Sequence, residues 1–502
     1  MKDPSRIYRW LLLVASVVTI VYLVGAAVRE NYLAQWRTVQ MEYRNLLREK
    51  ATDDRGRELL AKFRVEMKQA SIPALGTVDR CVTCHNGVDD PRMTDVPQPH
   101  RTHPGHILDK HPVDRFGCTV CHHGQGAALT FREAKAEDVF WDYPLLPPEM
   151  TESTCVTCHD AEKLPPNQIP LLTAGMKLYR EKSCGSCHKL GGRGGALGPA
   201  LDNEGAKTKH QLIMTNLKPP HTTWSWHNAH FRDPGGVVPD SLMRNPTVTG
   251  TEARALTAYM LSQSKRDVPE SYLAPDKIEQ KYRALHPVPV AGEQVYRQYC
   301  TACHGNGTYT RWDKKFNRFI PAIRGVSLVS TATPEYFRSN IERGRPGTQM
   351  PAWGLHAGGL LPEEITGVIE YLRSAASGAG AAGAPAVPAM AALAVHGDAS
   401  NGLSLFLRNC VGCHGMNGRG GMAPEVGNPV FQQAATDEFI IRTIRNGRIG
   451  TAMPAFQRTE APAFSDQNIA DVLAYLRTLG EAKGPKAMAQ NATSGTPSGG
   501  KP

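Results

Sequence analysis

Apolar residues are most concentrated near the start of the chain. Trp10 to Val28 is a run of nineteen residues without a charged side chain, and a helix of that length spans the hydrocarbon core of a bilayer. Basic residues lie on both sides of the run, so charge bias alone does not orient it. The pattern predicts a transmembrane anchor over residues 1–28. A signal peptide cleaved near Gly25 is the alternative, and the length of the run favours an uncleaved anchor.

Beyond this run the pattern changes to mostly charged positions with interspersed apolar ones. Residues 29–70 contain no proline, and charged residues separate their Leu, Met, Tyr and Trp side chains in a helical pattern. We expect a helical stalk over residues 29–75 that raises the rest of the chain above the bilayer. The same segment could instead pack against the membrane helices of a partner.

All twelve cysteines fall into six copies of Cys-x-x-Cys-His. This spelling predicts covalent attachment of c-type haem, because the two thiols can each add to one vinyl group and the next imidazole then ligates the iron. The sequence therefore predicts six haem c groups. The motifs are Cys81/Cys84/His85, Cys118/Cys121/His122, Cys155/Cys158/His159, Cys184/Cys187/His188, Cys300/Cys303/His304 and Cys410/Cys413/His414.

Two other uses of paired cysteines fit the pattern less well. A zinc site would group its cysteine pairs in fours and would not require a histidine after every second cysteine. A disulfide framework would not repeat one spacing six times and leave no cysteine over. Haem attachment takes place outside the cytoplasm, so we expect the C-terminal bulk of the chain on the periplasmic side of the inner membrane.

The first three motifs recur every 37 residues, with prolines, glycines and histidines between them. Three porphyrins within about eighty residues leave too little protein for an independent core, so the haems themselves must form it. We expect a compact, irregular trihaem module over residues 76–168. Histidines that could supply sixth ligands lie between the first two motifs or directly after the second: His100, His103, His106, His111 and His123.

The segment HPGHILDKHPVDRFGCTVCHHGQG resembles a membrane-anchored multihaem family in which two His-Pro pairs precede a Gly-Cys haem motif. The resemblance implies that His103 and His111 are distal ligands. His123 or His106 would serve the third haem.

From about residue 170 a different frame recurs three times. A short helix with Gly-x-x-x-aromatic leads into the cysteines, a proline loop and a methionine region follow the histidine, and a final helix carries a tyrosine on its buried face. We call residues 169–265, 291–375 and 397–480 the first, second and third repeats. The glycine and aromatic pairs are Gly175/Tyr179, Gly292/Tyr296 and Gly402/Phe406, and the later tyrosines are Tyr259, Tyr371 and Tyr475.

Each repeat resembles class I cytochrome c, an all-α fold. The resemblance implies that the first and last helices cross at the glycine and that a carbonyl of the proline loop orients the proximal imidazole. It also implies a Met-Pro loop that gives the sixth ligand, Met350 in the second repeat and Met453 in the third. The first repeat departs from this pattern. Its best candidate by position is Met243, with Met214, His227 and His230 as rivals.

The remaining segments have the composition of linkers and tails. Residues 266–290 are charged with scattered prolines, and residues 376–396 are rich in Ala, Gly and Pro, so the third repeat could swing as a tethered shuttle. Residues 481–502 form a polar tail that we expect to be disordered. The predicted fold class is mostly α: an anchor and stalk, a haem-packed irregular module and three small cytochrome c domains.

Composition changes the picture little. The formal net charge is +10, but each haem would add two propionates, so the charge does not indicate nucleic acid binding. The arrangement resembles cytochrome subunits of quinol-oxidising, bc-type respiratory complexes. The resemblance implies electron transfer from a membrane cytochrome b-like partner to a soluble or membrane acceptor, with no catalytic residues of the chain's own. Methionine ligation raises haem potential relative to histidine, so electrons would run outward from the membrane.

The alternative is an enzyme, either a multihaem reductase or a peroxidase. Such chemistry requires an iron with an open coordination position. No Cys-x-x-Cys-Lys motif, as used by ammonia-forming nitrite reductases, occurs in the chain. The fourth haem, or one of the first three, is where an open position could arise.

Overall fold

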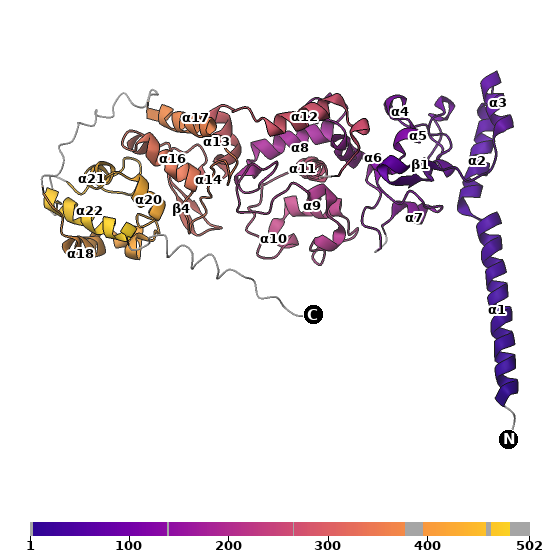
Figure 1. Ribbon diagram of the computed structural model, residues 1–502, viewed down its shortest axis with the longest axis horizontal. Helices are drawn as coiled ribbons and strands as arrows, with labels where there is room; N and C mark the ends of the chain where they lie inside the picture. Colours follow the sequence, from indigo (N-terminus) through magenta and orange to yellow (C-terminus); the bar gives the residue numbers. More distant parts are fainter. Residues whose placement is uncertain (1–3, 138–139, 265, 377–394, 458–462, 482–502) are drawn as a thin grey trace. The chain divides into compact units, whose positions relative to one another are not determined.

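The structure, a computed structural model, describes residues 4–137, 140–264, 266–376, 395–457 and 463–481. Helices dominate it, and its strands form two antiparallel pairs, which confirms the mostly α fold class (Figure 1). The chain forms two compact units, one of residues 1–173, 205–229 and 257–280 and the other of the remainder. This division runs through the first repeat. Most of the 376–396 linker and the tail beyond residue 481 lie outside the described residues.

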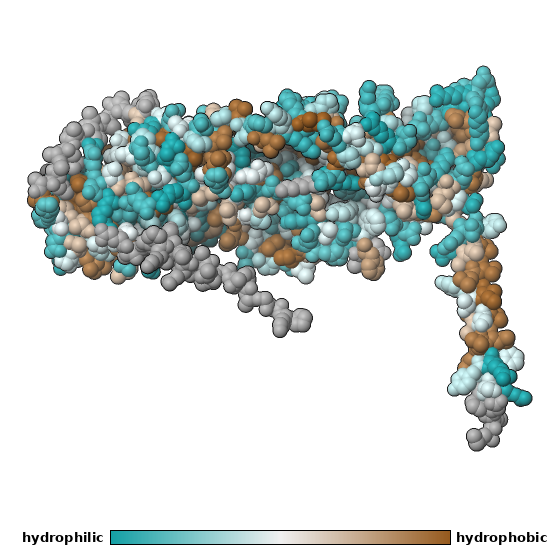
Figure 2. Space-filling view, in the orientation of Figure 1, coloured by the Kyte–Doolittle hydropathy of each residue, from teal (hydrophilic) through white to brown (hydrophobic). Residues whose placement is uncertain are grey.

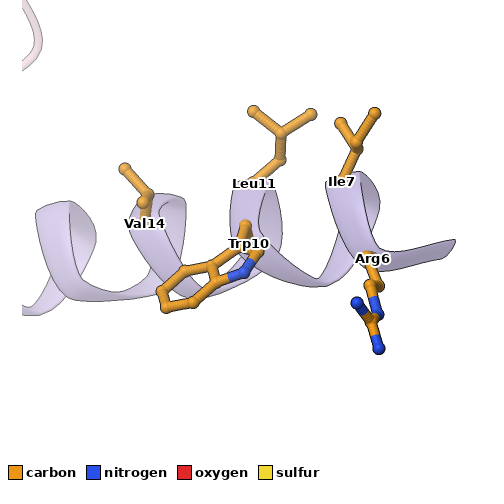
Figure 3. Close-up of a pocket in the computed structure, with 5 residues that line it drawn as sticks. All are labelled: Arg6, Ile7, Trp10, Leu11 and Val14. Carbon is orange, nitrogen blue, oxygen red and sulfur yellow. The ribbon is translucent and has the colours of Figure 1, made fainter. Parts of the chain in front are cut away.

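The first unit begins with α1 (Pro4–Tyr32). Among the described residues, α1 is the one helix long and apolar enough to cross a membrane, and its apolar stretch is unburied. Figure 2 shows brown, hydrophobic side chains along much of the visible face of this helix. The close-up in Figure 3 shows a shallow recess on the helix surface, lined by Arg6, Ile7, Trp10, Leu11 and Val14. A helix that is apolar all round and uncovered suits lipid contact better than a protein core.

The predicted stalk is packed rather than free. After a break at Ala34, α2 (Gln35–Lys50) buries Trp36, Val39, Tyr43 and Leu47 at helical spacing. Tyr43 and Leu47 share a hydrophobic cluster with two residues of the trihaem module, Met93 and Val96, so α2 lies on the module instead of holding it away. The buried Gln40 amide also donates to the carbonyl oxygens of Glu66 and Thr83.

The rest of the trihaem module consists of short elements joined by turns, as expected of a chain that surrounds haems. These elements are β2 (Thr77–Asp79), α4 (Ile107–Lys110), α5 (Val113–Phe116), α6 (Thr119–His122) and α7 (Phe131–Lys135), and α3 (Asp54–Lys62) and β1 (Ala70–Ile72) precede them in the 29–75 segment. The antiparallel pair β1–β2 aligns Ala70 with Asp79 and Ile72 with Thr77. Four helices contribute residues to both units: α8 (Pro170–Glu181), α9 (Thr223–Arg232), α11 (Gly250–Leu261) and α12 (Pro275–Leu285).

The second unit holds the second and third repeats. Its elements are α10 (Pro234–Val237), α13 (Gly292–Tyr299), α14 (Thr301–His304), β3 (Arg311–Asp313), β4 (Arg318–Ile320), α15 (Val326–Val329), α16 (Pro334–Arg343), α17 (Pro362–Arg373), α18 (Ala399–Asn409), α19 (Val411–His414), α20 (Pro429–Ala434), α21 (Asp437–Asn446) and α22 (Asp466–Glu481). The pair β3–β4 is an antiparallel hairpin. It lies between the haem motif and the proline loop of the second repeat, where the sequence predicts only a loop.

The helix crossings of these two repeats are confirmed. In the second repeat α13 crosses α17 so closely that a Cβ on Gly292 would lie 1.9 Å from the Gly367 carbonyl carbon. In the third repeat α18 crosses α22, and a Cβ on Gly402 would lie 1.9 Å from the Asp471 carbonyl oxygen. Only glycine permits such an approach of two backbones.

The aromatic partners of the crossings are also equivalent in the two repeats. The ring centroids of Tyr296 and Tyr371 lie 5.2 Å apart, and those of Phe406 and Tyr475 lie 5.2 Å apart.

The second and third repeats share one hydrophobic core. The ring of Tyr336 on α16 packs against Phe431 and Phe439 of the third repeat. An ion pair joins Arg318 to Glu425 at 2.6 Å. The third repeat is therefore docked on the second, and not free to swing as its flanking linker composition suggests.

Candidate haem-binding sites

Each of the six motifs folds into one tight helical turn. In every copy the amide of the second cysteine donates to the carbonyl of the first at 3.0–3.2 Å, and so does the amide of the histidine at 2.9–3.0 Å. Both thiols and the imidazole therefore leave the backbone from the same turn. This is the local geometry that attachment of one porphyrin through two thioethers requires.

The thiols are not joined in disulfide bonds. All twelve cysteines are free, which removes the disulfide alternative. Burial raises the pKa of Cys300 to about 12 and that of Cys410 to about 11. Within the described residues no three His, Cys, Asp or Glu side chains gather as a metal-binding cluster.

The proximal imidazoles of the three repeats are oriented by proline carbonyls, as the resemblance implies. Nδ1 of His188 lies 2.8 Å from the oxygen of Pro199, and Nδ1 of His414 lies 2.8 Å from that of Pro424. The equivalent pair, His304 and Pro321, is 3.4 Å apart. With Nδ1 bonded in this way, Nε2 remains for the iron. Burial lowers the pKa of His304 to about 4, which keeps its ring in the neutral form that binds metal.

The second cysteine of the motif is tied to the proline loop in the first and third repeats. The Gly198 amide donates to the Cys187 carbonyl oxygen at 2.9 Å, and the Ala423 amide donates to the Cys413 carbonyl oxygen at 3.0 Å. Each donor directly precedes the loop proline, so the bond fixes the proline carbonyl beside the motif histidine. This contact uses the backbone of the half-buried Cys413 and not its thiol. The thioether bond of Cys413 to haem is a prediction from the motif.

Two of the predicted distal histidines face motif histidines in the trihaem module. The ring centroids of His103 and His122 lie 6.1 Å apart, and those of His111 and His159 also lie 6.1 Å apart. Two metal–nitrogen bonds of ~2.0 Å and two ring radii of about 1.1 Å sum to about 6.2 Å. Both pairs thus have the separation that one iron between two imidazoles requires.

The other histidines of this segment differ in their surroundings. His111 already faces His159 of the third motif, so the prediction that His123 or His106 ligates the third haem does not fit the structure. His123 is buried 5.9 Å from the Tyr143 ring, and burial lowers its pKa to about 4. His106 is exposed, with Nδ1 3.2 Å from the Asp109 carboxylate.

The first motif has a different environment from the other two of the module. His85 lies close to the Pro99 carbonyl and to His100, and burial lowers its pKa. Nε2 of the buried His100 lies 3.4 Å from the Glu42 carboxylate. The described ring contacts thus give His85 no facing imidazole.

The three predicted methionine ligands sit in equivalent turns. In each, the methionine amide donates to a hydroxyl oxygen two residues earlier: Met243 to Ser241 at 3.2 Å, Met350 to Thr348 at 3.1 Å and Met453 to Thr451 at 3.2 Å. Ser241 therefore makes the first-repeat loop equivalent to the Met-Pro loops despite its divergent sequence.

The rivals of Met243 occupy other positions. Met214 and His227 belong to the other unit from His188, and the Nδ1 atom of His227 lies 2.8 Å from its own helix carbonyl at Thr223. His230 belongs to the same unit as His188 and Met243 and stays a possible ligand.

Motifs that are distant in sequence lie beside one another within each unit. A hydrogen bond between the Cys81 and Cys118 thiols lowers the pKa of Cys81 and raises that of Cys118. Burial and the neighbouring Cys158 raise the pKa of Cys121. The first motif thus adjoins the second, and the second adjoins the third.

The fourth and fifth motifs form a corresponding pair in the second unit. The hydroxyl of Ser183 lies 2.6 Å from that of Thr301 and 2.6 Å from the Arg297 carbonyl oxygen. Arg244, next to Met243, donates to the Ala302 carbonyl oxygen and pairs with Asp313. The loop that carries one predicted ligand is therefore fixed to the neighbouring haem motif.

Two buried or half-buried carboxylates at the haem motifs escaped the sequence reasoning. The Asp79 carboxylate accepts hydrogen bonds from the amides of Cys118 and Thr119 at 2.6 and 3.1 Å, which fixes the start of the second motif. Oδ1 of Asp276 lies 3.5 Å from Nδ1 of His159. Neither residue belongs to a local motif, so only the fold identifies them.

Comparisons with known proteins agree with this geometry. The family described as cytochrome c oxidase, cbb3-type, subunit III matches residues 288–372 and 397–476, and the cytochrome c family matches residues 172–264. The chain is 33% identical over 86 residues to a cytochrome c-553-like protein of Synechocystis, covering 17% of this chain and 73% of that protein.

Longer matches of lower identity are found to cbb3-type cytochrome c oxidase subunits. The FixP subunit of Bradyrhizobium sp. ORS 278 is 29% identical over 218 residues, which is 41% of this chain and 66% of that subunit. The CcoP subunit of Azospirillum sp. B510 is 28% identical over 222 residues, or 41% and 68%. The chain thus spans about two thirds of the length of these relatives. Together with the haem motifs and the apolar α1, these matches show that this chain belongs to the membrane-anchored multihaem c-type cytochromes.

Proposed function

We propose that the chain carries six covalently bound haem c groups and conducts electrons from a membrane quinol-oxidising, cytochrome b-like subunit to a periplasmic or terminal acceptor. The observation that carries the proposal is that the first three haem turns lie next to one another in the first unit and that the fourth lies next to the fifth in the second. Bound haem supplies the one-electron Fe(III)/Fe(II) couple. No catalytic residue of the chain is required, so it acts as an electron-transfer subunit and not as an enzyme by itself.

The chain's own residues would hold the six groups as follows. The twelve motif cysteines form the thioethers, and the six motif histidines are the proximal ligands. His103 and His111 are the sixth ligands of the second and third haems, and no residue is assigned to the sixth position of the first. Met243, Met350 and Met453 serve the fourth, fifth and sixth.

This ligand order supports a direction of electron flow. Imidazole ligands in the module near α1 favour low potentials, and thioether ligands in the repeats favour higher ones. Electrons would therefore move from the membrane outward. The matches of the second and third repeats to oxidase subunits support a terminal oxidase or a similar protein as acceptor.

The location follows from the same assignments. We place α1 across the inner membrane as a single uncleaved anchor and the haem domains on the periplasmic side. The domain order would be anchor (1–28), α2–α3 segment (29–75), trihaem module (76–168) and the three repeats with their linkers.

The second candidate is a multihaem reductase or peroxidase with one open iron. It rests on the first motif, where His85 has Pro99 and His100 as described neighbours. Carbon monoxide binding to the reduced wild-type protein would favour it, and a fully low-spin spectrum would favour electron transfer alone.

Gentle detergent extraction with a tag on this chain tests the partner. We expect a polytopic, cytochrome b-like subunit to co-purify stoichiometrically, and the complex to reduce the chain's haems when quinol is added. Purification of the chain alone, without quinol-dependent reduction, would contradict the role as outlet of a quinol-oxidising complex.

A further inference from the structure

Exposed aromatic and apolar residues mark the point where α1 ends. The charge-free run of α1 finishes at Val28, and the helix continues to Tyr32. Tyr32 and the following Leu33 are 76% and 72% exposed. Ala34 has an extended backbone, and α2 then starts at Gln35.

A second segment of the first unit is fixed to this same point. The backbone amide of Phe131, the first residue of α7, donates to the side-chain oxygen of Gln35 at 2.9 Å. Figure 1 draws α7 at the level of the junction between α1 and α2. We call residues 131–135 and 140–143 the exit loop. Its chain returns toward the second haem motif, where the Gly124 amide donates to the Tyr143 carbonyl oxygen at 3.0 Å.

The exit loop presents aromatic side chains outward. Phe140 is 93% exposed, whereas Phe131, Trp141 and Tyr143 are only 38%, 37% and 41% exposed. The Tyr143 hydroxyl also donates to the Ala206 carbonyl oxygen at 3.1 Å. Trp141 keeps its indole N–H bonded to the Tyr143 carbonyl oxygen at 3.1 Å, so its ring has a fixed position. Rings of this size are normally buried, and a group of them on a surface marks an interface.

Charge does not indicate a strongly acidic or basic partner. On and beside α7 the exposed Arg132 and Lys135 are balanced by the exposed Glu133 and Glu137, and the exposed Asp142 leaves a net charge of only −1 among these residues. Trp and Tyr, whose rings carry a polar edge, are enriched where a bilayer meets water.

The distance of the exit loop from the end of the apolar run at Val28 matches the boundary between bilayer and water. A helix rises 1.5 Å per residue, so Tyr32, the last residue of α1, lies about 6 Å beyond Val28, and Gln35 follows it after the break at Ala34. The polar layer adds about 5–7 Å to each side of the ~30 Å hydrocarbon core. Because Phe131 is bonded to Gln35, large side chains of the exit loop can reach this layer.

We propose that the exit loop inserts its aromatic side chains into the headgroup layer of the bilayer, as a second membrane contact beside α1. The proposal rests on the retention of α1 as an anchor. Two contacts would fix the orientation of the trihaem module relative to the membrane, whereas one helix with a break at Ala34 would leave it free to tilt.

The test uses the full-length holoprotein in lipid nanodiscs that contain a phosphatidylcholine with a photoreactive group near its headgroup. After illumination, labelled peptides are mapped by mass spectrometry. We expect label on α1 and on residues 131–145. The double variant Phe140→Ser, Trp141→Ser should lose the loop label severalfold while retaining the α1 label and the wild-type haem spectrum.

Tyr309→Ser is the matched control, because it removes an exposed aromatic residue of the second unit, and we expect it to leave the labelling unchanged. Label on α1 without label on the exit loop would overturn the proposal and leave the anchor and the proposed function intact. A lack of label on both would show that α1 is not retained, and both claims would then fail.

Discussion

At the scale of single residues, the partner of each proximal imidazole distinguishes the haem sites. In the three repeats a neutral proline carbonyl accepts from Nδ1, whereas in the third motif the Asp276 carboxylate lies 3.5 Å from Nδ1 of His159. A carboxylate gives the imidazole more anionic character than a carbonyl does, and this stabilises ferric iron. The third haem should therefore have a lower potential than histidine ligation alone would set.

Asp276→Asn tests this effect. The substitution keeps an oxygen that can accept from the Asp160 amide, as the Asp276 carboxylate does at 2.9 Å, but it removes the charge beside His159. We expect the midpoint potential of one haem to rise by tens of millivolts in a potentiometric titration, while Asp109→Asn, an exposed change, moves none. An unchanged titration of the Asp276 variant would show that the carboxylate does not act on the iron.

His111→Ala tests the distal ligand of the same site. Loss of the imidazole that faces His159 at 6.1 Å should leave one iron five-coordinate. We expect a high-spin signal from one haem and binding of about one carbon monoxide per reduced chain. His106→Ala is the control, because His106 is exposed and faces the Asp109 carboxylate. Equal behaviour of the two variants would exclude His111 as a ligand.

At the scale of elements, the glycine crossings and the methionine turns could be predicted because their determinants are local. The spacing from Gly292 to Tyr296 or from Gly402 to Phe406 is one helical turn, and the sequence repeats it. The roles of Asp79 and Asp276 could not be predicted in this way. Asp79 acts on a motif 39 residues later, and only the packing of the fold brings the two together.

The packing of α2 and of the third repeat was missed for a related reason. The pattern of an amphipathic helix, or of a linker rich in Ala, Gly and Pro, indicates only the local conformation of that segment. These patterns do not indicate that Tyr43 packs in a hydrophobic cluster with Met93, or that Tyr336 packs against the third repeat.

Gly402→Ala measures the importance of the helix crossing. The new Cβ would lie 1.9 Å from the Asp471 carbonyl oxygen, so α18 and α22 must separate. Overpacking of this kind costs about 1–3 kcal/mol, and we expect a lower free energy of unfolding for the third repeat in denaturant titration followed at its haem band. Gly250→Ala, at the start of α11 and outside the haem motifs, has nothing within 4 Å of its Cβ and should be neutral. Equal stabilities would contradict a tight crossing in solution.

At the scale of the whole molecule, ligand type follows chain order. Histidine pairs lie in the module next to α1, and methionine loops lie in the repeats. A spectroscopic redox titration should therefore resolve a low-potential group and a high-potential group, within the ~0.8 V range that axial ligands span. Met350→His should move one member of the high group into the low group, and the exposed Met416→His should move none. Six overlapping midpoints would contradict an outward gradient.

The central claim is that one chain carries six covalent haems as an electron conduit. The most direct measurement is the intact mass of the purified, denatured protein, because thioether-bound haem survives denaturation and non-covalent haem does not. The account predicts the mass of the polypeptide, with α1 retained, plus six haem groups. A mass with five haems or fewer in protein matured with a full haem supply would contradict it.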